Sequence, residues 1–292
     1  MKRIICILFC ICLFLSGCGS QDAQIAATTL PVYEFTIRIC QNTGLQVTRL
    51  VTESVSCLHD YSLQVSQMRA IESADVIVLS GAGLEEFLSD ALNGANSVID
   101  ASLDVPLICS EEEHGHDHDH EDHGHHHEQD PHIWLSPENA KIMAENICTG
   151  LSLLYPEHKD LFLNNLDSLI DDLDALQAYG TQQLSDLSCR EMITFHDGFS
   201  YLALEYDLHI LEAVEEESGS EASAQELIEL IEITRQHALP AIFTEISGSL
   251  AAADIIARET GSAVYSLDMA MSGDSYFSSM YHNIDTLKEA LG

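Results

Sequence analysis

The chain has 292 residues, of which 48 are acidic and 11 are basic, so its formal net charge at pH 7 is −37. This charge argues against nucleic acid and anionic lipid as binding partners, and it favours cations by raising their local concentration. The length suits two modest domains better than one.

The chain begins with a secretory signal peptide, in which Lys2 and Arg3 precede an apolar run from Ile4 to Leu15. This run is too short to cross a bilayer comfortably. The sequence Leu15-Ser16-Gly17-Cys18 resembles a bacterial lipobox, which implies cleavage before Cys18 and a lipid anchor on its sulfur. The mature protein would then be extracytoplasmic and tethered to the bacterial cell membrane. The alternative is a short anchor that is not cleaved, and residues 1–17 are excluded from the fold in either case.

Nine cysteines occur in the chain, three of them in the signal peptide and one at the proposed lipid site. The other five are Cys40, Cys57, Cys109, Cys148 and Cys189. They show no CxxC spacing, which excludes a zinc ribbon, and at most two disulfides could form in an oxidising compartment. We expect most of them to be small buried hydrophobic residues.

Short apolar runs alternate with helical patterns over the first hundred residues. The expected strands are 25–30, 45–52, 76–79 and 97–99, and the expected helices are 32–40, 64–73 and one that begins near Leu84, after Gly81 and Gly83. Strands separated by helices of this length predict a parallel sheet covered on both faces.

Residues 111–130 are the most biased segment, with eight histidines, nine carboxylates and no Lys, Arg, aliphatic or aromatic residue. Such a composition can bind metal but cannot fold alone, so we expect a disordered loop that captures metal ions. Its histidines are His114, His116, His118, His120, His123, His125, His126 and His127. The alternative is a low-complexity segment with incidental metal affinity.

At Asp130 the acidic, histidine-rich composition ends. A Ser-Pro-Glu start at Ser136 then predicts a helix to about Leu154.

Leucine and isoleucine residues spaced three to five apart predict one long amphipathic helix over 157–187, which would span more than about 40 Å. A coiled-coil arm is the alternative, but the pattern is too short and too irregular to favour it. Strands are then expected at 192–195, 241–244 and 264–267, and helices at 198–206, 223–237, 250–260 and 278–291. The predicted fold is therefore α/β, with two Rossmann-like lobes (18–155 and 188–292) joined by one long helix (156–187).

Candidate metal ligands were sought where the predicted strands end, because open α/β sheets bind their ligands there. His196 follows the strand 192–195, Glu245 follows 241–244, and Asp268 follows 264–267. His59 lies in the loop after the strand 45–52, and His132 follows the histidine-rich loop. Each residue alone could be a helix cap or a surface residue. Together they place imidazoles and carboxylates at the same edge of the two lobes.

The mature chain resembles the ZnuA-type zinc and manganese solute-binding proteins of ATP-driven importers, the cluster A-I family. The passages that carry the resemblance are Ala74–Gly81 with Leu84-Glu85, Asp130–Leu135, Thr194–Asp197 with Tyr201-Leu202, and Phe243–Glu245 with Glu259–Gly261. The acidic histidine-rich loop just before Asp-Pro-His is similar to that of the zinc branch.

The resemblance implies that His59, His132, His196 and Asp268 bind the metal, with Glu245 as an acidic neighbour or an alternative ligand. Around His59 the family pattern Pro-His-x-Tyr is replaced by Leu58-His59-Asp60-Tyr61, so Cys57 or Asp60 could supplement this histidine. Ile246 and Met269 also stand where the family tends to have proline.

Three neutral imidazoles and one carboxylate form a four-coordinate shell that zinc accepts, whereas manganese prefers more oxygen ligands. We therefore expect Zn²⁺ as the bound ion and Mn²⁺ as the alternative. Because the imidazoles must be neutral to bind, acid should weaken binding. If the ligands come from both lobes, opening of the cleft would release the ion, and the long helix should limit that opening to a small tilt.

The resemblance implies a carrier that works with the permease and ATPase of a metal importer, and we expect it to be a monomer. One alternative is a zinc hydrolase with Glu245 as general base, although no HExxH or nucleophile-elbow motif supports it. Another is a surface adhesin or a metal buffer that uses the same site without a transporter. A hydrolase would turn over generic ester or peptide substrates, whereas a carrier would only bind.

Overall fold

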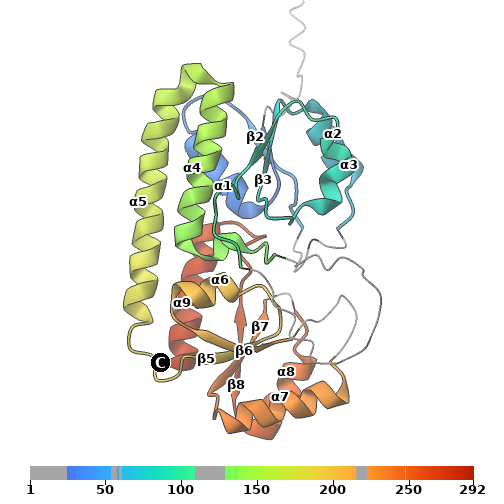
Figure 1. The fold of residues 1–292 in the computed structure, drawn as a ribbon, viewed down its shortest axis with the longest axis vertical. Coiled ribbons are helices and arrows are strands. Elements are labelled where there is room, and N and C mark those ends of the chain that lie inside the picture. Colours follow the sequence, from blue (N-terminus) through green and yellow to red (C-terminus); the bar gives the residue numbers. More distant parts are fainter. Residues whose placement is uncertain (1–24, 54–57, 59–60, 109–128, 215–221, 247) are drawn as a thin grey trace, which may run out of the picture.

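The computed structural model describes residues 25–53, 58, 61–108, 129–214, 222–246 and 248–292. Two four-stranded sheets lie one above the other, and α4 and α5 run side by side, α4 beside the upper lobe and α5 extending further toward the lower one (Figure 1). Every recorded strand pairing is parallel. The expected α/β class with two lobes is confirmed, while the exact domain boundaries remain a prediction.

The first sheet has the strand order β2-β1-β3-β4. Its strands are β1 (Ile25–Ala27), β2 (Val47–Arg49), β3 (Val76–Leu79) and β4 (Val98–Asp100). The helices of this lobe are α1 (Leu30–Ile39), α2 (Val65–Ser73), η1 (Glu86–Leu88), α3 (Ser89–Leu92), η2 (Ile133–Leu135) and α4 (Pro137–Leu154). The central strands β1 and β3 are almost wholly apolar and buried, as the middle of a parallel sheet requires.

The second sheet repeats the arrangement, with the order β6-β5-β7-β8. Its strands are β5 (Glu191–Thr194), β6 (His209–Ala213), β7 (Ala241–Glu245) and β8 (Ala263–Leu267). Its helices are α6 (Ser200–Glu205), α7 (Ala224–Gln236), α8 (Ala251–Thr260) and α9 (Tyr276–Leu291). The strand β6 was not predicted, because its residues are only half-buried or exposed at the sheet edge and give no apolar run.

The helix expected near Leu84 is replaced by a turn and the short helices η1 and α3. Gly81, Ala82 and Gly83 all have positive φ, a left-handed conformation that a right-handed helix cannot contain. The carboxylate of Glu85 then folds back and accepts hydrogen bonds from the backbone N–H groups of Ser80 and Gly81 at 2.7 and 3.0 Å. The turn expected at Gly81 and Gly83 is therefore present, and η1 and α3 follow it in place of one longer helix.

The long helix is shorter than expected. A 3-10 turn, η3 (Pro156–His158), precedes α5 (Lys159–Gln183), whose 25 residues correspond to about 38 Å. The guanidinium of Arg190 donates to the carbonyl oxygens of Leu184 and Ser185 at 2.9 and 3.1 Å, which satisfies acceptors just after the helix ends. α5 packs against α1, α4 and α9, so it contacts elements from both halves of the chain.

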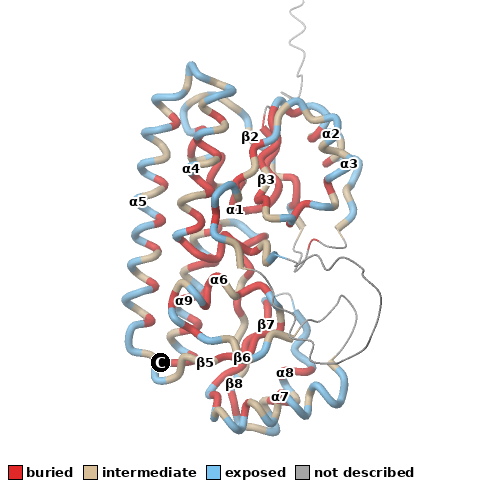
Figure 2. Tube along the Cα trace, in the orientation of Figure 1, coloured by how far each residue is buried: buried red, intermediate tan, exposed pale blue. Residues whose placement is uncertain are grey.

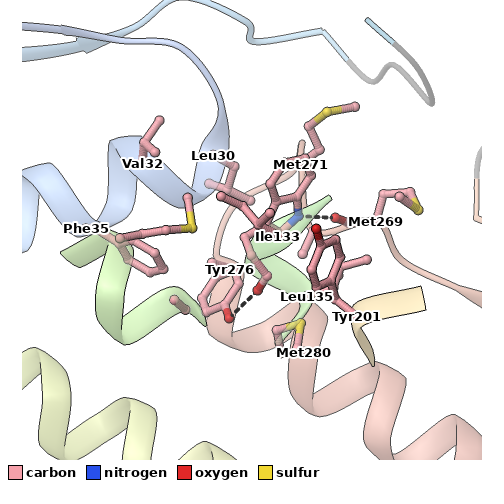
Figure 3. Close-up of a cluster of buried hydrophobic side chains, with 14 of the residues drawn as sticks. Leu30, Val32, Phe35, Ile133, Leu135, Tyr201, Met269, Met271, Tyr276 and Met280 are labelled. Carbon is pink, nitrogen blue, oxygen red and sulfur yellow. Dashed lines mark hydrogen bonds between the residues drawn. The ribbon is translucent and has the colours of Figure 1, made fainter. Parts of the chain in front are cut away.

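One buried hydrophobic cluster extends through both lobes, from Ile25 to Leu291 (Figure 2). At the junction, the Trp134 indole Nε1 donates to the Met269 carbonyl oxygen at 2.8 Å, and the Tyr276 hydroxyl donates to the Trp134 carbonyl oxygen at 2.8 Å (Figure 3). The Leu30 N–H also donates to the Met271 carbonyl oxygen at 3.2 Å. The lobes therefore share a packed core, which opposes a wide opening between them.

Cys40 and Cys148 are buried and Cys189 is half-buried, and all three are free thiols. Burial, and then the proximity of Cys148, raises the pKa of the Cys40 thiol to about 12. Both buried thiols thus act as apolar packing groups, in line with the sequence expectation. Cys57 and Cys109 lie outside the described residues.

Candidate metal centre

His132 lies just before η2, in a segment held firmly by the core. The three residues that follow it are fully buried, and its own side chain is only 6% exposed. Asp130 Oδ1 accepts from the His132 backbone N–H at 2.9 Å and lies 2.8 Å from His132 Nδ1. Because a carboxylate oxygen can only accept, Nδ1 carries the proton and Nε2 presents its lone pair.

His196 lies at the end of β5 and is oriented in the same way. Its Nδ1 is 2.7 Å from Oε1 of Glu245, which ends the neighbouring strand β7 and is 5% exposed. Nε2 of this ring is therefore also the free, lone-pair nitrogen. A Cβ on Gly198 would lie 2.6 Å from His196 Cδ2, so only glycine leaves room for the ring as placed.

The two free nitrogens face each other. His132 Nε2 and His196 Nε2 are 3.4 Å apart, and the ring planes meet at 83°. With both Nδ1 atoms protonated, neither Nε2 has a proton to donate, so the pair cannot hydrogen-bond while both imidazoles are neutral. Two nitrogens at about 2.0–2.1 Å from a tetrahedral zinc ion lie about 3.4 Å apart. The observed spacing is therefore that of two ligands of one metal ion.

Asp268 follows β8 and is held by its own neighbourhood. Its Oδ1 accepts from the Ala270 N–H at 2.8 Å and its Oδ2 from the Ser279 hydroxyl at 2.7 Å. The Asn283 side chain binds the Asp268 N–H and carbonyl oxygen, both at 2.7 Å. These contacts point the carboxylate in one direction, but no contact with either imidazole is recorded.

Within the described ranges, no three His, Cys, Asp or Glu side chains converge in an arrangement that would hold a metal ion. The structure thus brings His132, His196 and Glu245 together and does not add Asp268 to them. His59, Asp60 and Cys57 lie outside the described residues, as do Cys18 and the eight histidines of the 111–130 loop.

Two carboxylates beside the imidazoles were missed as site residues. Asp130 was read only as part of a motif, although an Asp two residues before a histidine is well placed to cap it. Asp197 is exposed as a whole residue. The protein around its carboxyl group still removes part of the solvent, which raises the pKa of Asp197, and the negative charge of Asp130 raises this pKa further. His196 and His132 act in the opposite direction on this pKa. The two carboxylates add negative charge beside the pair of imidazoles, which favours a cation.

In the part of the chain that the structure describes, every helix is too short or too polar to cross a membrane.

Similarity to known proteins extends over nearly all of the described residues. A family model described as zinc-uptake complex component A, periplasmic, matches residues 25–290. The zinc-binding lipoprotein AdcA of Streptococcus pneumoniae (serotype 4) is 32% identical over 307 residues, which cover 99% of this chain. They cover 61% of AdcA, so this chain spans less than two thirds of that relative.

Two solved structures share this architecture. A crystal structure of ZnuA superposes with a TM-score of 0.78 at 28% identity, covering 93% of this chain and 100% of that one. The Zn(II)-bound ZnuA-like domain of Streptococcus pneumoniae AdcA has a TM-score of 0.75 at 28% identity, covering 91% of this chain and 98% of that one.

Proposed function

The chain belongs to the family of periplasmic zinc-uptake complex component A, and on this premise we propose that it captures Zn²⁺ outside the cytoplasm, between its two lobes. It then delivers the ion, as cargo, to the permease of an importer driven by an ATPase. The family resemblance inferred from the sequence motifs is confirmed. In this family the component A is a transport protein, and we propose that this chain likewise binds its ion without catalysing a reaction.

One observation carries the proposal: His132 and His196 present their Nε2 atoms to each other at 3.4 Å, and a carboxylate holds each Nδ1. The carboxylates fix the tautomer of both rings and prevent the rings from turning away. Nitrogen ligands in a tetrahedral spacing suit Zn²⁺, while Mn²⁺ prefers oxygen ligands.

We propose that His59 and Asp268 complete the shell. Each Asp268 oxygen accepts one recorded hydrogen bond, and a carboxylate has about four lone-pair positions, so it can still bind a metal. The Ser279 and Ala270 donors would then orient a ligand, as Asp130 and Glu245 orient the histidines.

The position of Glu245 opposes a catalytic role. Its Oε1 is engaged by His196 Nδ1 at 2.7 Å, so this oxygen orients an imidazole and is not free to activate a water molecule. The same interaction argues against Glu245 as a direct ligand through that oxygen. Purified protein loaded with zinc should therefore leave generic ester and peptide substrates unchanged.

We further propose that Cys18 carries the lipid anchor, that the protein acts as a monomer, and that the histidines of the 111–130 loop collect zinc for the tight site. Release of zinc needs only a small displacement, because loss of one or two ligands weakens a four-coordinate site strongly. A small displacement suits two lobes that share a packed core.

The deciding experiment is a metal competition on the soluble chain from Gly19 onward. After equilibration with zinc and manganese together, and removal of weakly bound metal with a chelator, we expect one zinc ion per chain. Preferential retention of manganese would contradict the zinc assignment.

The same assay on His59→Ala tests the ligand that the structure does not describe. Zinc affinity should fall strongly in this variant, and Cys57→Ala should leave it unchanged. Equal affinity of His59→Ala and the unaltered chain would remove His59 from the shell.

A further inference from the structure

We propose that the thioether of Met269 is a third ligand beside His132 and His196, so that this centre also binds the soft monovalent cation Cu(I). The inference rests on the proposed metal site, because it uses the same two imidazoles.

The main chain of Met269 is fixed against the His132 segment. Its carbonyl oxygen accepts from the Trp134 indole Nε1 at 2.8 Å, and the Trp134 ring contacts the His132 ring edge-on, with centroids 5.5 Å apart. The residue is only 5% exposed. Figure 3 draws it among the buried hydrophobic residues at the lobe junction, with Leu30 and Met280.

The end of this side chain lies beside His196. A Cβ on Gly198 would be 2.6 Å from Met269 Cε, 2.6 Å from His196 Cδ2 and 2.9 Å from His196 Nε2. The thioether methyl and the metal-binding edge of the imidazole therefore border the same small space above Gly198. The sulfur is one bond from this methyl, and a rotation about the Cβ–Cγ bond of this flexible side chain would turn it toward an ion held by the two imidazoles.

The chemistry of the three groups fits Cu(I). A thioether is neutral and polarisable, and soft ligands of this kind select Cu(I), while imidazole suits both copper and zinc. Zinc would complete its shell with a carboxylate, and the adjacent Asp268 offers one. Two consecutive residues thus offer a charged oxygen and a neutral sulfur to an ion held by the same pair of histidines. A small rearrangement of this segment would match the third ligand to the ion.

The test uses the full mature chain labelled with selenomethionine, loaded anaerobically with one equivalent of Cu(I) in the presence of a chelator that removes weakly bound copper. X-ray absorption at the copper edge should show one selenium neighbour at bonding distance. Selenium distinguishes methionine from the cysteine thiols, which would appear as sulfur.

Met269→Leu keeps a similar apolar volume and should remove the selenium neighbour. It should weaken Cu(I) binding by about tenfold or more while leaving the zinc affinity within about threefold. The matched control is Met271→Leu, because Met271 is also buried, lies two residues away and packs in the lobe junction. It should change neither affinity.

Absence of a selenium neighbour in the unaltered chain, or equal Cu(I) affinity in Met269→Leu, would overturn the inference and leave Met269 as an apolar cover. Zinc titrations on the same preparations keep the two proposals separate. Tight zinc binding without a copper–selenium contact would sink only this inference. A copper–selenium contact without tight zinc binding would sink the zinc function and leave the inference standing.

Discussion

His132 and His196 hold their Nε2 atoms 3.4 Å apart across the two lobes, although 64 positions separate them in the chain. Neither ring can turn away without losing the carboxylate that holds its Nδ1, Asp130 for one and Glu245 for the other. The pair is therefore pre-organised for a metal ion, and this arrangement underlies the first two predictions.

Replacing His196 with alanine should abolish tight zinc binding, because it removes the ligand that we propose the second lobe contributes. The loss should exceed that of any single substitution between His114 and His127. Isothermal calorimetry on the chelator-washed protein measures it. His237→Ala is the matched control, since His237 also pairs with a carboxylate, Glu191 at 2.9 Å, but away from the site. Unchanged tight binding in His196→Ala would show that the site is elsewhere.

Asp130→Ala should weaken zinc binding by about 10- to 100-fold without abolishing it, the range typical of partners that orient a metal-binding histidine. The Nδ1 proton of His132 would lose its acceptor at 2.8 Å, and the backbone N–H of His132 would lose the same oxygen at 2.9 Å. Competition with a zinc chelator of known affinity gives the ratio. Glu191→Ala, which removes the corresponding partner of His237, should leave zinc affinity unchanged, and an equal loss in both variants would point to a general effect on folding.

Deletion of 112–129 should remove several weak zinc-binding events and keep one tight event and the folded state. The Asp130 N–H donates to the Ile108 carbonyl oxygen at 3.0 Å, so the chain on either side of the loop is already close together and a short connection suffices. Cells that carry the deletion should grow normally with ample zinc and lag only under chelation. Loss of the tight event in the purified deletion protein would instead show that the loop supplies a ligand.

Tyr276→Phe should lower the free energy of unfolding by about 1–3 kcal/mol, because the buried Trp134 carbonyl oxygen loses the donor that lies 2.8 Å away at the lobe junction. Urea unfolding followed by circular dichroism measures the change. The control is Tyr265→Phe, because the Tyr265 hydroxyl donates to Glu289 at 3.4 Å in an exposed hydrogen bond, and this variant should change stability by less than about 0.5 kcal/mol. Equal losses of unfolding free energy in the two variants would show that the hydrogen bond at the lobe junction stabilises the fold no more than a surface hydrogen bond does.

Glu85 should make stability depend on pH. Burial raises the pKa of this carboxyl to about 7, although hydrogen bonds from the Thr28 hydroxyl and the N–H groups of Ser80 and Gly81 act to lower it. The folded state therefore binds the proton more tightly than the unfolded chain. The stabilisation that protonated Glu85 contributes is full below pH 4.5, the pKa of this carboxyl in the unfolded chain, and it is lost as the pH rises to about 7.

Each unit of pKa shift corresponds to about 1.4 kcal/mol, so Glu85 should account for a fall of roughly 3 kcal/mol over this interval. Glu85→Gln cannot ionise and should lose that part of the pH dependence, whatever its effect on stability at one pH. Unfolding free energies between pH 4.5 and pH 8 for both proteins give the comparison. Identical slopes would mean that Glu85 does not titrate in this range.

Local patterns in the sequence were enough to predict most of the fold. The apolar runs at Val76–Leu79 and Ala241–Thr244 and the cap at Ser136 lie in the strands and the helix expected of them, because hydrophobic periodicity and capping depend on near neighbours. The same patterns placed His196 and Glu245 at strand ends. The turn at Gly81 and Gly83 was expected, but strand β6 and the short helices η1 and α3 were beyond this reasoning, because the residues of β6 give no apolar run and lie half-buried or exposed.

The contact between the two imidazoles of the proposed metal centre comes from the packing of the two lobes. That Glu245 holds Nδ1 of His196, that the Nε2 atoms of His132 and His196 face each other, and that Met269 reaches the space above Gly198 all depend on the relative placement of elements distant in sequence. The Trp134 and Tyr276 bonds at the shared core set that placement. The contact of Asp130 with Nδ1 of His132 is local, because the two residues are only two positions apart. Sequence alone thus determined which residue types stand at the strand ends, and only the tertiary structure decided which of their atoms face one another, because that depends on the packing of side chains between the lobes.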